Sequence, residues 1–285
     1  MILSKKAFLP VALSGLLSLS LTACFHDEAE DDHDEHHHGL IELTLNANQV
    51  TDSTKAASTR TATASLTFHE DDGELTGSVM IMGDPITGIS VYDGFAGEVG
   101  TELFPLEQDP TSAMMWMIPE DSTTLITPAK LGQGGYYLRA ELADGNILRS
   151  QITPEGIEVA VAELLDASDV RGGFAGVTLN TGTHEVVAYV AIPDLINIAT
   201  DGVLLETYSA ATPAVITDPT ITLVVDDNAS GQAYKTPSLL ADRTLGHESM
   251  EDIAAGRWHI IVKNTTNATN ADGELTGSLP AVSHH

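Results

Sequence analysis

The sequence predicts an all-β protein in which two tandem antiparallel β-sandwich domains follow a disordered acidic and histidine-rich leash. Short apolar stretches alternate with polar residues in steps of two, as half-buried strands do. Turn pairs such as Asp144-Gly145 separate them about every ten residues, which is typical of a sandwich and unlike a βαβ plan. A hydrophobic content of 42% argues against a wholly disordered chain. We expect residues 40–160 and 161–285 to form the two domains.

Residues 1–23 have the three parts of a secretory signal peptide. Lys5 and Lys6 precede an apolar stretch that is too short for a membrane-spanning helix, and small residues follow it. Leu21-Thr22-Ala23-Cys24 resembles the lipobox of bacterial lipoproteins, which implies that Cys24 is acylated and starts the mature chain. The alternative is an ordinary signal peptide followed by a chance cysteine. In lipoproteins, a residue such as Phe25 after the cysteine implies transfer to the outer membrane, where more than one acyl chain gives a stable anchor.

The net charge narrows the classes of partner, and the cysteine content bears on how the fold is stabilised. The formal net charge is −29, which excludes nucleic acid and anionic lipid surfaces as partners and favours cations or simple solubility in a salty medium. Cys24 is the single cysteine, so a lipid on it leaves no thiol for a disulfide. The fold must therefore be stabilised by its apolar core.

The predicted leash, residues 24–39, contains a tract of histidines and carboxylates without apolar periodicity. Imidazole and carboxylate groups together suit Zn²⁺, Cu²⁺ or Ni²⁺. Weak binding of such an ion is one interpretation, and a solvated acidic spacer is the other. Neutral imidazole is the ligand, so affinity should fall below about pH 6.5. The candidate ligands are His26, His33, His36, His37, His38, Asp27, Glu28, Glu30, Asp31, Asp32, Asp34 and Glu35.

In the first domain the alternation predicts strands that are joined by polar or glycine-bearing turns. They are Leu40–Leu45, Ala62–Phe68, Leu75–Met82, Ile86–Tyr92, Glu102–Phe104, Met114–Ile118, Tyr136–Leu142 and Ile147–Ile152. We expect Met114–Ile118 to be buried, with binding of Cu(I) by its methionines as an alternative. Thr127 to Leu131 suits one helical turn with Pro128 at its first position. For Ile157–Leu165 the sequence leaves strand and short helix open.

From Gly173 the order of predicted strands and turns repeats, which indicates an internal duplication. Val177-Thr178-Leu179 matches Leu66-Thr67-Phe68 at an offset of 111 residues. Further matches join Glu185–Pro193 to Glu74–Pro85, Ile221–Val225 to the Met114 stretch, Glu248–Ala255 to the helical turn, Trp258–Val262 to Tyr136–Ala140, and Asp272-Gly273 to Asp144-Gly145.

The order of these stretches resembles the CHRD domain, a module named from chordin that also occurs in bacterial secreted proteins. Leu125–Leu131 and Gly135–Leu138 follow the family's helical turn and aromatic strand, and Gly145–Ile152 and Gly273–Leu279 follow its closing strand. The resemblance implies an immunoglobulin-like or superoxide-dismutase-like sandwich with an extracytoplasmic binding role. The family's His-x-His pair would fall at 90–92 and 197–199, where this chain has no histidine, so no histidine role carries over.

The body offers no recognisable catalytic motif. His69, His184, His247 and His259 lack ligand spacing, and the acidic turns at 71–73 and 226–228 suit Ca²⁺ only weakly. We therefore expect a non-enzymatic, lipid-anchored protein of the bacterial outer membrane with a binding or structural role, no required cofactor and an envelope protein as its partner. The alternative function is metal handling, in which the leash captures Zn²⁺, Cu²⁺ or Ni²⁺.

Overall fold

The computed structural model describes the chain from residue 38 to residue 281 with nine internal gaps. The described ranges are 38–50, 59–69, 73–82, 86–166, 171–192, 198–207, 220–227, 232–238, 244–264 and 275–281. Strands dominate them, and every strand pair is antiparallel. The all-β prediction is confirmed. In the described part of the chain, no helix is long and apolar enough to cross a membrane.

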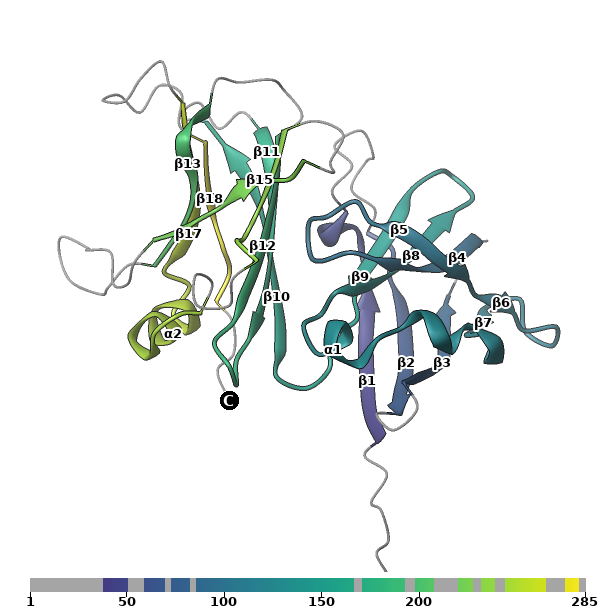
Figure 1. Cartoon of the computed structure of the whole chain (residues 1–285). Helices are drawn as coiled ribbons and strands as arrows, with labels where there is room; N and C mark the ends of the chain where they lie inside the picture. The colour runs from purple at the N-terminus through teal and green to yellow at the C-terminus, as the bar shows by residue number, and fades with distance from the viewer. Residues whose placement is uncertain are drawn as a thin grey trace, which may run out of the picture. The chain divides into compact units, whose positions relative to one another are not determined.

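The first lobe, residues 38–152, contains two sheets (Figure 1). Its five-stranded sheet has the spatial order β1 His38–Leu45, β2 Ala62–His69, β3 Glu74–Ile81, β7 Met115–Met117 and β6 Glu107–Gln108. Its four-stranded sheet has the order β5 Thr101–Pro105, β4 Ile86–Asp93, β8 Tyr136–Leu142 and β9 Ile147–Gln151. Three short helical segments complete the lobe: η1 Ala47–Gln49, η2 Glu120–Leu125 and α1 Pro128–Leu131.

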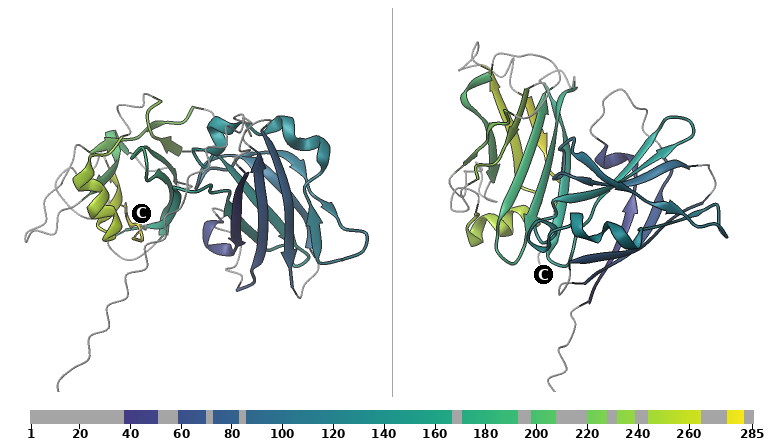
Figure 2. Two further views of the ribbon diagram at one scale, coloured as in Figure 1. Left: turned by 90° about the horizontal axis from the view of Figure 1, so that it is seen from below. Right: turned by 45° about the vertical axis from the view of Figure 1, so that its right-hand side comes forward.

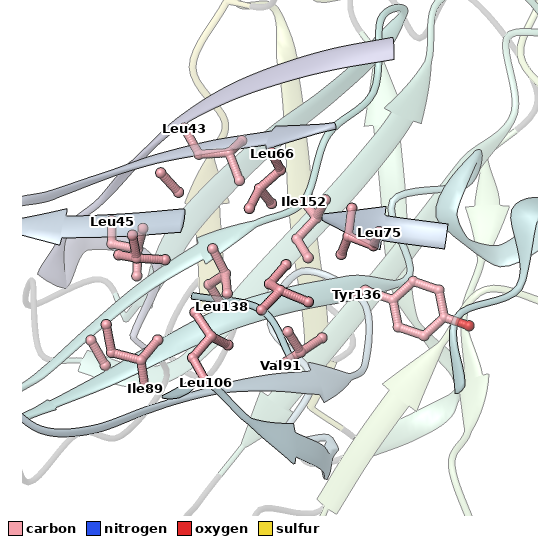
Figure 3. Close-up of a cluster of buried hydrophobic side chains, with 14 of the residues drawn as sticks. Leu43, Leu45, Leu66, Leu75, Ile89, Val91, Leu106, Tyr136, Leu138 and Ile152 are labelled. Atoms are coloured by element: carbon pink, nitrogen blue, oxygen red, sulfur yellow. The ribbon is translucent and has the colours of Figure 1, made fainter. Parts of the chain in front are cut away.

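The core of the first lobe lies between these two sheets (Figure 3). Alternate residues of β2 point inward, so Leu66 is buried while Thr63 is exposed. From the other sheet, Val91 of β4 and Leu138 of β8 enter the same cluster. Burying each such side chain contributes about 1.5–3 kcal/mol, which is the stabilisation that a lobe without a disulfide depends on.

The second lobe, residues 157–281, forms one nine-stranded sheet that curls nearly closed (Figure 2). Its spatial order is β14 Ile221–Thr222, β13 Ile198–Thr207, β17 Trp258–Asn264, β18 Leu275–Ser278, β10 Ile157–Leu165, β11 Arg171–Asn180, β12 Val186–Ile192, β16 Gln232–Lys235 and β15 Val224–Val225. One residue, Leu223, separates the edge strands β14 and β15. The fully buried Trp258 lies in the core, near helix α2, His247–Ala254.

The two lobes have the same strand order, which agrees with the predicted duplication. The order β1-β2-β3-β7-β6 recurs as β10-β11-β12-β16-β15, and β5-β4-β8-β9 recurs as β14-β13-β17-β18. In the second lobe, pairing of Leu165 with Thr276 joins the two series into one sheet. The corresponding junction in the first lobe is a single bridge between Asn46 and Arg149.

Several predictions of detail are settled by the strand pairing. Ile157–Leu165 is a strand that pairs with β11, so the predicted domain boundary after residue 160 falls inside β10. Strand β1 begins at His38, two residues before the predicted strand and inside the range expected to be leash. Matching Ile221–Val225 to the Met114 stretch was wrong, because β16 occupies the place of β7 in the strand order. The expected burial of Met114–Ile118 was also wrong: Ile118 is buried, but Met114 and Met117 are exposed.

Candidate functional site

The predicted anchor and most of the metal-binding tract lie outside the described residues. This holds for Cys24 and for the candidate ligands from His26 to His37. The last candidate, His38, starts β1, where its backbone pairs with that of His69. Among the described residues there is no group of three or more His, Cys, Asp or Glu side chains that could hold a metal ion.

Two histidines of the body lie together, which their spacing in the sequence did not predict. His184, in a left-handed turn with φ of 59°, stacks on His247 of α2 with ring centroids 6.4 Å apart. Of the two acidic turns considered for Ca²⁺, residues 71 and 72 lie outside the described part of the chain. In the other, Lys235 Nζ donates to Asp226 Oδ1 at 2.8 Å, so this carboxylate is held by an ammonium group.

The most elaborate polar arrangement in the described residues covers the outer side of the four-stranded sheet. We call it the tyrosine–arginine face and define it as Tyr92 of β4, Tyr137 and Arg139 of β8, and Arg149 and Gln151 of β9. Strand register brings these side chains together: Tyr92 pairs with Tyr137, Arg139 with Arg149, and Tyr137 with Gln151. Alternation directs the neighbouring residues, such as Leu138 and Leu148, into the core instead.

Arg149 is the buried anchor of this face, with 4% of its surface exposed. Its Nη1 donates to the carbonyl of Glu98 and its Nη2 to that of Phe95, each at 2.8 Å. The guanidinium carbon lies 3.6 Å from the centroid of the Tyr137 ring, which is cation–π geometry. Burial lowers the pKa of Arg149 to about 10, because removing the cation from water disfavours its charged form. This cation is thus held by carbonyl dipoles and an aromatic ring.

Two further contacts fasten the loop of residues 94–100 to the same face. Gln151 Nε2 donates to the carbonyls of Gly94 and Gly134, at 2.6 and 2.7 Å. The backbone N–H of Gly100 donates to the Tyr137 hydroxyl at 3.1 Å. Burial raises the pKa of Tyr137, so its hydroxyl stays protonated at neutral pH. The loop is therefore fixed from both ends by side chains of β8 and β9.

The other half of the face, Tyr92 and Arg139, is half-buried and partly exposed to solvent. The Tyr92 ring stacks on that of Tyr137 with centroids 5.1 Å apart, and its hydroxyl accepts a hydrogen bond of 2.9 Å from Arg139 Nη1. Arg139 Nη2 also lies 2.9 Å from a carboxylate oxygen of Glu141. On the opposite flank, Glu102 accepts from Ser90 Oγ at 2.9 Å. Charged groups and hydroxyls thus alternate along this half of the face and hold one another in place.

The second lobe shows what the fold itself requires at these positions. By strand register, Tyr92, Tyr137, Arg139, Arg149 and Gln151 correspond to Glu206, His259, Ile261, Thr276 and Ser278. Glu206 and Ile261 are only 5% and 7% exposed. The same strand order forms in the second lobe without any of the five side chains, so the order of the strands does not require them.

Sequence reasoning did not single out the tyrosine–arginine face. Tyr136 and Tyr137 were recognised only as an aromatic strand, and Arg149 to Gln151 only as part of a closing strand. A usable signal was present in the alternation of polar side chains at 137, 139 and 141 and at 149 and 151, opposite apolar neighbours that fill the core. What the sequence lacked was the register that pairs these two strands with each other and with β4.

Comparison of the chain with protein-family models, with curated proteins and with solved structures finds no match.

Proposed function

We propose that this chain is a non-enzymatic protein, anchored in the outer membrane through a lipid on Cys24, that binds an envelope protein through the partly exposed half of the tyrosine–arginine face. The observation that carries the proposal is the difference between the lobes. Equivalent strands carry a stacked tyrosine and arginine network in one lobe and unrelated side chains in the other. The Arg149 half of this network fastens the loop of residues 94–100 within the chain, and the Tyr92–Arg139 half is the part that we assign to contact with a partner.

The chemistry of the face favours a protein as that partner. Tyrosine and arginine are enriched in the energetically dominant parts of protein interfaces. Both faces of the tyrosine pair are occupied, because Arg139 lies over Tyr92 and Arg149 over Tyr137. This leaves hydroxyl, guanidinium and carboxylate edges for directional hydrogen bonds. Their fixed geometry lowers the entropy that ordering side chains would otherwise cost on binding.

Site-specific photocrosslinking in cells tests this proposal. A photoreactive residue in place of Glu141, beside Arg139, should give one discrete crosslinked species. A matched photoreactive residue in place of Thr63, exposed on the other sheet of the same lobe, should not. The double variant Tyr92→Ala/Arg139→Ala should abolish the species while leaving amide exchange in β8 unchanged. Equal crosslinking from both positions, or none from Glu141, would contradict a partner at this face.

The anchor has its own test. Cys24→Ser should release the protein from the membrane fraction, because the acyl chains are attached through the cysteine sulfur. Retention of the serine variant in membranes would contradict the proposed anchor.

Metal handling by the leash is a second candidate, favoured by five histidines within thirteen residues of an acidic sequence. Calorimetric titration with Zn²⁺, Cu²⁺ and Ni²⁺ should compare the mature chain with a variant in which His26, His33, His36 and His37 are asparagine. His38 is retained because it starts β1. Loss of binding in the variant supports capture by the leash; unchanged binding, or none in either protein, leaves the leash a spacer.

A further inference from the structure

Methionines gather on the outer side of the five-stranded sheet of the first lobe. Five of the chain's seven methionines lie there or at its margin: Met80, Met82, Met114, Met115 and Met117. Met80 is 44% and Met117 40% exposed, and Met115 is half-buried. Methionine most often fills gaps in a core, so a group of exposed methionines calls for a separate explanation.

Strand register places three of these side chains together, and we call them the methionine patch: Met80 of β3 and Met115 and Met117 of β7. Met80 pairs directly with Met115, and Met117 pairs with Ser78, two residues along the same face. Directly opposed side chains have Cβ atoms about 4.5–5.5 Å apart, and diagonal neighbours are about 7–8 Å apart. Flexible thioether side chains at the corners of such a triangle can converge on one atom.

The core does not need these methionines. On the inner side of the same two strands, Val79 is fully buried and Trp116 packs against the core. The equivalent pair in the second lobe is Val190 and Tyr234, which pack in the same way. On the outer side, however, the second lobe has Ala191, Ala233 and Lys235 where the first has Met80, Met115 and Met117. Thioethers are therefore a property of one lobe and not of the strand ladder.

We propose that the methionine patch binds a soft monovalent cation, Cu(I) or Ag(I), through the three thioether sulfurs. Thioethers are soft ligands that select Cu(I) over hard divalent cations. Three neutral sulfurs leave the bound ion its positive charge, which suits a chain with a net charge of −29. The carboxylate of Glu107 is exposed on β6 at the position that pairs with Met117, so an anionic group flanks the patch.

This site differs from the proposed leash in its response to pH. Thioethers do not titrate between pH 5 and 7, whereas imidazole ligands become protonated below about 6.5. Binding at the methionine patch should therefore persist at pH 5, where capture by histidines is weakened. The site does not depend on the partner proposed for the tyrosine–arginine face, since it lies on the other sheet of the lobe.

The decisive measurement is an anaerobic competition for Cu(I) between the mature chain and a chromophoric Cu(I) chelator at pH 5. The chain should withdraw one equivalent of Cu(I). The variant Met80→Leu/Met115→Leu/Met117→Leu keeps side-chain volume, and it should lose affinity by at least about tenfold. The control Met82→Leu/Met114→Leu alters two exposed methionines outside the patch and should stay within about twofold of the unaltered chain.

Methyl NMR with Ag(I) supplies an independent readout in the folded protein. The ε-methyl signals of the three patch methionines should shift, while that of Met250, which is buried in the second lobe, should not. Unchanged Cu(I) affinity in the triple variant would overturn the proposal, as would an equal loss in the control variant. Equally tight binding of Zn²⁺ to the patch would overturn it as well.

Discussion

The two lobes share a strand order but differ in the side chains on the outer sides of their sheets. At the positions where the first lobe has Tyr92, Tyr137 and Arg149, the second has Glu206, His259 and Thr276. The inward positions are more alike: Tyr136 at the start of β8 corresponds to the fully buried Trp258 at the start of β17. The core of this sandwich thus constrains the size and polarity of the side chains that fill it, whereas the outer side of the sheet accommodates different side chains in the two lobes.

The largest expected difference between the two lobes is the loss of stability when Arg149 is substituted. Arg149→Met should destabilise the first lobe by about 3 kcal/mol, because the carbonyls of Phe95 and Glu98 lose their donors on a largely buried face. The equivalent change Thr276→Ala, at an exposed position, should alter the second lobe by less than about 0.5 kcal/mol. Amide hydrogen exchange resolved for β8 and β17 measures the two lobes separately. Equal effects would show that Arg149 has no anchoring role.

A second difference lies in the backbone of β3. Gly77 has φ of +127°, and an added Cβ would lie 2.2 Å from the carbonyl oxygen of Ser65, yet the second lobe has Ala188 at the equivalent position. Gly77→Ala should therefore cost the first lobe about 2 kcal/mol or more, since both the dihedral angle and the contact oppose it. The reverse change, Ala188→Gly, should cost only about 1 kcal/mol through backbone entropy. Denaturant unfolding compares the two; similar losses would contradict a glycine requirement confined to β3.

The smallest expected effect is a pH dependence of the second lobe. Burial lowers the pKa of His259 below 6.5, with Glu206 partly opposing the shift. Because the folded state binds this proton less tightly than the unfolded state, stability is present above about pH 6.5 and is lost as the pH falls through the lowered value. Exchange of β17 amides at about pH 7.5 and 5.5, corrected for intrinsic rates, should reveal the loss. The variant His259→Gln should remove this part of the dependence; an identical profile in the variant would exclude His259 as its source.

Local pattern was enough to predict much of the fold. The hairpins β2–β3 and β8–β9 and the helical turn at Pro128 were anticipated because alternation, turn residues and proline act within a few residues. The repeat was visible for the same reason, since its clearest matches fall on single strands such as β2 and β11. Even Thr127 is the residue before the helix, although its hydroxyl meets the Tyr136 hydroxyl instead of capping a backbone N–H.

Contacts between strands that lie far apart in the chain could not be predicted from the sequence. Met80 and Met115 become neighbours only through the β3–β7 pairing, and Tyr92 meets Tyr137 only through β4–β8. The Met114 stretch was expected to be buried because hydrophobicity alone does not tell which side of a strand faces the core. Its three-residue strand, β7, is too short for alternation to decide the direction.

The placement of β1 has a mechanical consequence. For a chain held at Cys24 as proposed, tension from the membrane reaches the body through His38, at the start of β1. That strand is secured by eight residue pairs to β2 and, at its far end, by two backbone hydrogen bonds between Asn46 and Arg149. A force directed along β1 would shear all eight residue pairs at once, whereas a force perpendicular to β1 would separate the pairs one after another. The first strand would then carry the load between the anchor and the body, and the backbone hydrogen bonds to Arg149 would hold its far end in place.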